Sequence, residues 1–461
     1  MKATHVSLLP AVAAANAGRP SLTPELLAAS GARYSRNNEG LDSILSKIDP
    51  NNLDKSVDSI FRMIDYGHQS IADMVPIAMF IDDVSILLAY IIWALCPTAS
   101  GQESSTRYIK LRLDSLVDPT DLGVPDEEKS DWYAFMGQCF EAYENSVAFW
   151  EGVATANPEV TLIPSSILND PSDKSQKQVA RMKRNYAFDR ARYFLPVAAK
   201  TNLMLIMSAR GWIQLNQQLF SHWLPEARKL ALLIHGELKL VAPRLIKHSE
   251  PKASFTKGLA LELADLVGMA GKRSQKTQGE VNCVAQTALF LPQGITDDEL
   301  ASSLAAHDNR YGYIGEASRR TAVRFSWSAV AIAEIRDLNR HRTGQKYCPL
   351  LPQGFYCAED KIPPLASAES LPRNVGDVAT GKACSSLSNG FPGFAAWTLL
   401  GTQYSFEHVT TLDKYIYEAE LRTGTGAHFR YAKHLRDSVE ALRLSYPRTA
   451  EAIQLGSAEP E

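Results

Sequence analysis

Apolar residues recur at helical spacing along much of the chain, and this pattern predicts a helix-rich protein. A strand-like stretch at residues 75–81 interrupts the helices, so we expect an α+β protein with a small sheet. The apolar run 84–96 predicts a buried helix, since it is shorter than the roughly 20 residues of a membrane span. Further helices are expected over residues 22–66, 131–153, 199–247, 321–339, 395–421 and 426–445, whereas residues 358–393 are expected to be irregular.

The order of predicted elements occurs twice. An offset of 245 residues, from Tyr66 to Tyr311, also matches Ala72 with Ala317 and Phe80 with Phe325. This faint similarity predicts two tandem units. A polar, proline-containing stretch at 249–280 lies between them, so we place the units at residues 1–250 and 251–461, with a small sheet in each.

The amino-acid composition bears on the number of domains, on nucleic-acid binding and on the state of the cysteines. With 461 residues, 45% hydrophobic and 21% charged, the chain is long enough for more than one globular domain. A formal net charge of −3 argues against a general nucleic-acid binder. The six cysteines are scattered without a CxxC pair, which favours reduced thiols in a cytoplasmic protein and predicts no metal site. We expect neither export nor a membrane partner.

Two polar stretches are candidates for chemistry. The first is the basic triplet, Arg340-His341-Arg342, which suits an anion or an electron-rich heterocycle. The second is the loop 98–108, with hydroxyls, one carboxylate and one arginine that suit a phosphate-bearing ligand. Each also has a simpler interpretation: a basic helix end for the triplet and a solvated turn for the loop.

Each half resembles the flavin-dependent thymidylate synthases, whose hallmark is Arg-His-Arg followed, after seven residues, by Ser. The second half has the basic triplet, but the serine position falls on Leu350. In the first half Leu95-Cys96-Pro97 replaces the triplet, yet the count reaches Ser105 inside Gln102-Glu103-Ser104-Ser105-Thr106-Arg107. The two halves thus keep opposite parts of the motif.

Other family elements are divided in the same way. The first half keeps Gly67-His68 with Ser70, and it also keeps Ser35, Arg192 and Arg210 in their family contexts. The second half keeps a helix-ending Leu421-Arg422, whose arginine contacts the pyrimidine in the family.

The resemblance implies reductive methylation of dUMP to dTMP, with methylenetetrahydrofolate and NAD(P)H as co-substrates and FAD as cofactor. It implies catalytic roles for Arg422 and Ser105. The implied substrate-binding residues are Gln102, Glu103, Ser105, Arg107, Arg192 and Arg422, and the implied cofactor-binding residues are Ser35, His68, Ser70, Arg210, Arg340, His341 and Arg342.

Family members build each site between four identical subunits, so a fused chain need not keep every part in both halves. We therefore expect composite sites in a homodimer that forms a pseudo-tetramer. Two alternatives remain open: modification of another pyrimidine nucleotide, or a non-catalytic homologue that binds flavin or nucleotide. Cys96 is expected to be a core residue rather than a nucleophile, and His428 and Arg430 are expected on a solvated helix face.

Overall fold

The computed structural model divides the chain into two compact units. Unit 1 comprises residues 1–104 and 200–263, and unit 2 comprises residues 105–199 and 264–461. The structure describes residues 1–6, 12–18, 21–34, 41–49, 52, 55, 57–58, 70–96, 98–107, 111–272, 279–364, 366 and 371–460. The expected boundary after residue 250 therefore separates the two sheets, but the compact units are divided elsewhere, because residues 105–199 group with the second sheet.

Unit 1 is built on a four-stranded antiparallel sheet of order β1-β2-β4-β3. Helices α10 and α11 pack beside this sheet, and the Trp212 indole of α10 donates to the carbonyl of Ile77 at 3.1 Å. The strands are β1 (Lys2–Val6), β2 (Pro76–Ser85), β3 (Ser100–Glu103) and β4 (Lys200–Ser208). The helices are α1 (Val12–Asn16), α2 (Pro24–Tyr34), α3 (Leu41–Ser46), α5 (Ser70–Asp73), α6 (Ile86–Leu95), α10 (Ala209–Ser221), α11 (Pro225–Val241) and α12 (Ala253–Lys272), which continues past the end of the unit.

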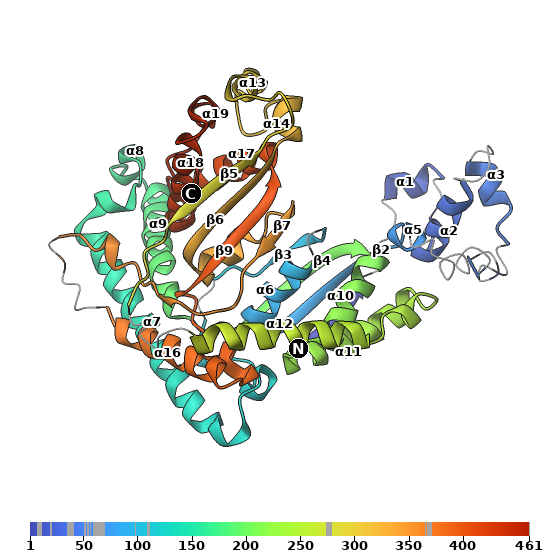
Figure 1. Cartoon of the computed structure of the whole chain (residues 1–461), viewed down its shortest axis with the longest axis horizontal. Helices are drawn as coiled ribbons and strands as arrows, with labels where there is room; N and C mark the ends of the chain where they lie inside the picture. The colour runs from blue at the N-terminus through green and yellow to red at the C-terminus, as the bar shows by residue number, and fades with distance from the viewer. Residues whose placement is uncertain are drawn as a thin grey trace. The chain divides into compact units, whose positions relative to one another are not determined.

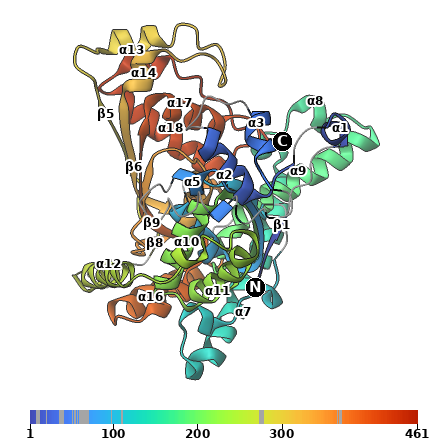
Figure 2. The same ribbon diagram turned by 90° about the vertical axis from the view of Figure 1, so that its right-hand side faces the viewer.

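Unit 2 repeats this arrangement with a sheet of order β5-β6-β9-β7 (Figure 1). Strand β8 pairs with β9. Helices α17 and α18 pack against the sheet, and α13 and α14 lie together at one end of β5 (Figure 2). The strands are β5 (Ala285–Phe290), β6 (Ala322–Ala331), β7 (Gln345–Tyr347), β8 (Gly354–Phe355) and β9 (Thr402–Thr411). The helices are α7 (Lys129–Ala156), α8 (Ser165–Leu168), α9 (Asp173–Ala191), α13 (Asp297–Ser303), α14 (Glu316–Arg320), α15 (Ile332–Leu338), α16 (Arg373–Ser388), α17 (Leu412–Thr423), α18 (Phe429–Arg443) and α19 (Pro447–Glu451).

The two sheets share their strand register, which confirms two tandem units of α+β structure. Pro76 pairs with Ser208 in unit 1, and Ala322 pairs with Thr411 in unit 2. The register shifts after Ile81 in β2 and after Trp327 in β6, at the same step of each strand. This shared irregularity is stronger support for duplication than the faint sequence match.

The repeat offset is 246 residues in these strands, from Pro76 to Ala322, rather than 245. The match of Phe80 with Phe325 is therefore wrong, because a slip of one residue turns a strand side chain to the other face. Phe80 is 45% exposed, whereas Phe325 is fully buried. The offset of 245 does hold for β3 and β7, so unit 1 has one residue more from the start of α6 to the start of β3 than unit 2 has from the start of α15 to the start of β7.

Three expected helices contain strands. Residues 199–247, 321–339 and 395–421 each contain a β-strand (β4, β6 and β9) that passes directly into a helix (α10, α15 and α17). Because no loop separates strand from helix, the apolar residues form one continuous run in which the alternation is hidden. The stretch 358–393 was also misjudged, since it contains α16.

Other local predictions are confirmed. The strand at 75–81 is part of β2, the run 84–96 contains the buried helix α6, and 131–153 lies within α7. Cys96 is 5% exposed, and burial raises the pKa of its thiol to about 12, so it is an inert core residue. Within the described part of the chain, no helix combines the length and apolarity needed to cross a lipid bilayer.

Candidate functional site

The basic triplet follows α15 in unit 2 and meets the end of α17. The Nε of Arg422 donates to Nε2 of His341 at 2.7 Å, and its Nη2 donates to the carbonyl of Asp337 at 2.8 Å. Burial, together with the charge of Arg422, lowers the pKa of His341 to about 3 although Glu418 opposes this shift. His341 is therefore a neutral hydrogen-bond acceptor at neutral pH. Its bond with Arg422 joins two of the predicted site residues.

A buried polar group holds the segment after the triplet. His408 lies 3.1 Å through Nδ1 from Glu418 Oε2, and its Nε2 lies 2.6 Å from the carbonyl of Thr343. Oxygen atoms therefore lie close to both ring nitrogens of His408. Lys346 donates to the carbonyl oxygens of His341 and Thr343.

Glu418 is almost fully buried, at 1% side-chain exposure. Burial would raise the pKa of its carboxyl, but the imidazoles of His341 and His408 outweigh that effect and bring it to about 2. The carboxylate is therefore the counter-charge of this group.

Unit 1 has no counterpart of the buried polar group at the register-equivalent positions. The β-sheet register aligns His408 with Leu205 and Lys346 with Gly101, and the same alignment extended into the helix puts Glu418 at Leu215. These polar residues occur in the unit that keeps the basic triplet. We therefore infer that they support the basic triplet, because the same fold in unit 1 does without them.

The predicted phosphate-binding residues also lie in unit 2. Arg107 forms a two-pronged ion pair with Asp189, at 2.7 and 2.8 Å, and donates to the carbonyl of Gly426 at 3.0 Å. Its amide donates to the hydroxyl of Ser105 at 3.2 Å. Arg192 is 2% exposed and faces Asp337 at 3.4 Å and Glu334 at 3.6 Å.

His428 connects these groups. Its Nε2 lies 3.1 Å from the carbonyl of Asp189, and burial, with the charges of Arg192 and Arg107, lowers its pKa well below the usual value. Arg107, Arg192 and Arg422 therefore gather in one unit, although they come from three distant parts of the sequence.

The remaining predicted residues lie in unit 1 or outside the described residues. Gln102 is exposed on β3, and Glu103 is buried beside it. Ser70 is exposed on α5, and Arg210 pairs with Asp73 at 2.8 Å. Ser35 and His68 lie outside the described residues.

Arg210 also lines a cavity of about 330 Å³ within unit 1. Its wall carries the donor side chains of Gln214, Lys247 and Lys252 and one carboxylate, Glu250. Cations outnumber the carboxylate, so an anionic ligand fits the chemistry of this cavity.

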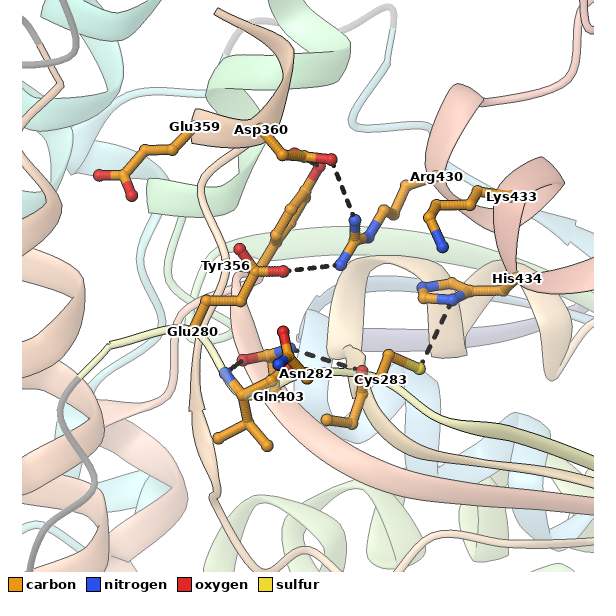
Figure 3. Close-up of polar contacts among 12 residues, drawn as sticks. Glu280, Asn282, Cys283, Tyr356, Glu359, Asp360, Gln403, Arg430, Lys433 and His434 are labelled. Atoms are coloured by element: carbon orange, nitrogen blue, oxygen red, sulfur yellow. Dashed lines mark hydrogen bonds and ion pairs between the residues drawn. The ribbon is translucent and has the colours of Figure 1, made fainter. Parts of the chain in front are cut away.

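Several buried residues of unit 2 were not identified from the sequence. The solvated face expected for His428 and Arg430 is wrong, because they are 0% and 5% exposed. Arg430 lies between Glu280, at 2.9 Å, and Asp360, at 3.4 Å, with its guanidinium 3.8 Å from the centre of the Tyr356 ring (Figure 3). Only long-range packing reveals such partners.

Glu418 and Glu334 were missed as well. Glu418 precedes Arg422 by four residues on α17, a spacing that places both on one helix face and gave a usable signal. Glu334 accepts from the Tyr193 hydroxyl at 2.9 Å. Burial raises the pKa of Glu334 to about 7 although Arg192 opposes the shift.

Comparison with known proteins supports the resemblance. Residues 20–244 match the family described as "Thymidylate synthase complementing protein". A flavin-dependent thymidylate synthase of Clostridium tetani is 26% identical over 235 residues, which cover 50% of this chain and 83% of that protein. A UPF0159 protein of Thermoplasma acidophilum is 24% identical over 251 residues, or 50% of each chain. Another UPF0159 protein, from Chlamydia pneumoniae, is 26% identical over 207 residues, which cover 43% of this chain and 36% of that protein.

These alignments span about half of this chain, and about half or less of the two UPF0159 proteins. The second sheet, β5-β6-β9-β7, lies beyond the residues that match the family. Residues 20–244 of the chain are therefore similar to the thymidylate synthase complementing family, and the chain is also similar to a flavin-dependent thymidylate synthase.

Proposed function

We propose that the chain is a flavin-dependent thymidylate synthase that methylates dUMP to dTMP, with methylenetetrahydrofolate and NAD(P)H as co-substrates. The observation that carries this proposal is the gathering of Arg107, Arg192 and Arg422 around His428 and Asp337 in unit 2. A nucleotide monophosphate needs charge-assisted donors for its phosphate and a cation near its ring, and this set of residues supplies both.

We assign a role to each of these residues from its contacts and its place in the motif. Arg422 is the proposed cation for the oxygen of the pyrimidine ring, and its bond to His341 fixes the plane of its guanidinium. Ser105 and Arg107 are the proposed phosphate contacts, together with Gln102 and Glu103 of the preceding strand. Arg192 is part of a buried ion-pair group, so a role for it in phosphate binding requires exchange of Asp337 for the ligand.

FAD is the proposed cofactor, and its reduced form would supply the hydride for the transfer. The chain offers suitable groups in both units. Arg210 and the lysines of the unit 1 cavity suit the pyrophosphate, and this cavity has the size of one part of a dinucleotide site. Arg340, His341 and Arg342 are proposed to hold the flavin, with contributions from Ser35, His68 and Ser70.

The division of these residues favours a composite site. We propose a cytoplasmic homodimer in which the flavin-binding residues of unit 1 and the basic triplet of unit 2 come from different chains. Such a dimer would have two complete sites, whereas a tetramer of four identical subunits has four.

One assay tests the function. Purified protein is examined for bound flavin and then supplied with dUMP, methylenetetrahydrofolate and NADPH. A yellow protein that forms dTMP is the expected result. A protein that takes up no FAD would overturn the proposal.

A second function is favoured by one observation: Arg107 and Arg192 already face carboxylates, and Leu350 stands where the second copy of the motif would have serine. This pattern fits a relative that modifies a different pyrimidine nucleotide. Flavin-bearing protein that leaves dUMP unchanged but modifies another pyrimidine nucleotide would support it, whereas flavin binding without any turnover would indicate a non-catalytic homologue.

A further inference from the structure

Arg190 is a buried cation that the proposed function does not use. Its side chain belongs to α9 and is 8% exposed, and burial lowers the pKa of its guanidinium. The guanidinium lies 3.4 Å from the centre of the Tyr186 ring and 4.3 Å from that of Phe429. These two aromatic rings hold it rigidly, because a planar guanidinium stacks well on aromatic faces.

The charge of Arg190 has little compensation. Its Nη1 donates to the carbonyl of Tyr186 at 3.1 Å, while its Nε is buried without a hydrogen-bond partner. Within the described residues no carboxylate forms an ion pair with it, since the neighbouring Asp189 is engaged by Arg107. A buried charge without a counter-ion is unfavourable, so a rigidly held one indicates a missing anion.

A cavity of about 70 Å³ lies at this position in unit 2. Arg107, Asp189 and Arg190 are the charged groups of its wall, and together they leave one net positive charge. Such a space admits a small oxyanion but no nucleoside. Gly426 and Ala427, which follow the helix end that carries Arg422, form another part of the wall.

We propose that Arg190, together with Arg107, binds the phosphate group of a phosphate monoester in this cavity. The identity of the nucleotide rests on the proposed function. The binding of an anion in this cavity does not. The proposal adds Arg190 as a phosphate contact that needs no exchange of Asp337, whereas Arg192 faces Asp337 and Glu334. Binding would place the phosphate beside the chain that leads to the proposed pyrimidine contact, Arg422.

The test measures binding to the full chain by calorimetry. The probes are inorganic phosphate, dUMP, deoxyuridine and FAD, and the proteins are the unchanged chain, Arg190→Met and Arg190→Lys. Arg184→Met is the matched control, since Arg184 is an exposed arginine on the same helix. We expect Arg190→Met to weaken binding of dUMP and of inorganic phosphate at least tenfold, Arg190→Lys to restore part of it, and Arg184→Met to change nothing.

The probes separate the possible outcomes. Equal loss of dUMP and phosphate binding, with deoxyuridine unaffected, supports a phosphate-monoester site. Loss confined to FAD would overturn the proposal, as would unchanged phosphate binding in Arg190→Met.

Thermal unfolding supplies a second readout in case Arg190→Met folds less well. Phosphate should raise the melting temperature of the unchanged chain and of Arg184→Met, and should leave that of Arg190→Met unaltered. A phosphate response that persists in Arg190→Met would mean that Arg190 is merely a packing residue. Because neither readout uses turnover, a chain that binds phosphate through Arg190 but forms no dTMP would overturn the proposed function alone.

Discussion

The Nε of Arg422 donates a hydrogen bond of 2.7 Å to Nε2 of His341, and this bond joins the helix-ending arginine to the basic triplet. A histidine that accepts from an arginine is unprotonated at that nitrogen. The proposed contact to the pyrimidine and the proposed contact to the flavin are therefore parts of one hydrogen-bonded unit, so a change at either residue affects both.

The first prediction concerns the protonation of His341. Arg422→Met removes a nearby cation, so the pKa of His341 should rise from about 3 toward its ordinary value near 6.5. NMR titration of the histidine ring signals between pH 3 and 8 measures this change, since a shift of one pKa unit is roughly a tenfold change in the protonation equilibrium. Arg443→Met, at a partly exposed arginine of α18, serves as the control. A His341 signal that titrates identically in both variants would contradict the coupling.

The second prediction concerns stability in acid. The pKa of Glu418 is depressed from 4.5 to about 2 in the folded chain, so its contribution is present above pH 4.5 and is lost as the pH falls toward 2. Glu418→Gln should therefore flatten the fall of the free energy of unfolding in this range, by about 3 kcal/mol in all. Urea unfolding at a series of pH values measures it. The slope should persist in Glu440→Gln, which changes an exposed carboxyl of α18.

The third prediction concerns the segment that follows the triplet. His408→Leu gives unit 2 the residue that unit 1 has at this position, and it removes the contact to the carbonyl of Thr343. Amide hydrogen exchange in residues 341–346 should become at least tenfold faster.

A matched control tests the specificity of this effect. His307→Leu breaks another buried pair, in which Nε2 of His307 lies 2.8 Å from Glu420. Glu420 belongs to α17, the helix that also carries Glu418, the partner of His408. Exchange in residues 341–346 should stay as in the unchanged chain. Equal acceleration in both variants would mean that the effect is general loosening of unit 2.

The fourth prediction separates single-chain from two-chain sites. Arg107 and Arg422 both belong to unit 2, where Arg107 contacts the carbonyl of Gly426. Mixing Arg107→Ala with Arg422→Ala should therefore restore no dTMP formation, whereas mixing Arg210→Ala with Arg422→Ala should restore part of it. Exchange of fluorescently labelled chains must be shown first. Recovery in the first mixture would overturn the view that both arginines serve one site from one chain.

The fifth prediction tests the corrected repeat. Phe325 is buried against His408 and Tyr415, with ring centres 4.9 and 4.7 Å apart, so Phe325→Ala should cost about 3–5 kcal/mol of unfolding free energy. Phe80 is 45% exposed, and Phe80→Ala should cost less than about 1 kcal/mol. Chemical denaturation compares the two. Equal losses would restore the offset of 245 that the sequence match favoured.

The resemblance to the family, the duplication and the elements with a local pattern could be predicted from the amino-acid sequence alone. The helix α6 is apolar throughout, and β2 begins with a short apolar run, so neighbouring residues were enough. The motif pieces Arg340-His341-Arg342, Ser105 with Arg107, and Leu421-Arg422 were also readable, because their spacing is local.

The surroundings of these motif pieces depend on long-range packing and could not be predicted from the sequence. Strands β4, β6 and β9 merge with the helices that follow, and only pairing with a partner strand separates the two periods. The partners of Arg107, Arg192 and Arg422 come from residues far away in the sequence, and so does the burial of Arg190. Burial and charge pairing are properties of the packed unit, and no local spacing of residues contains them.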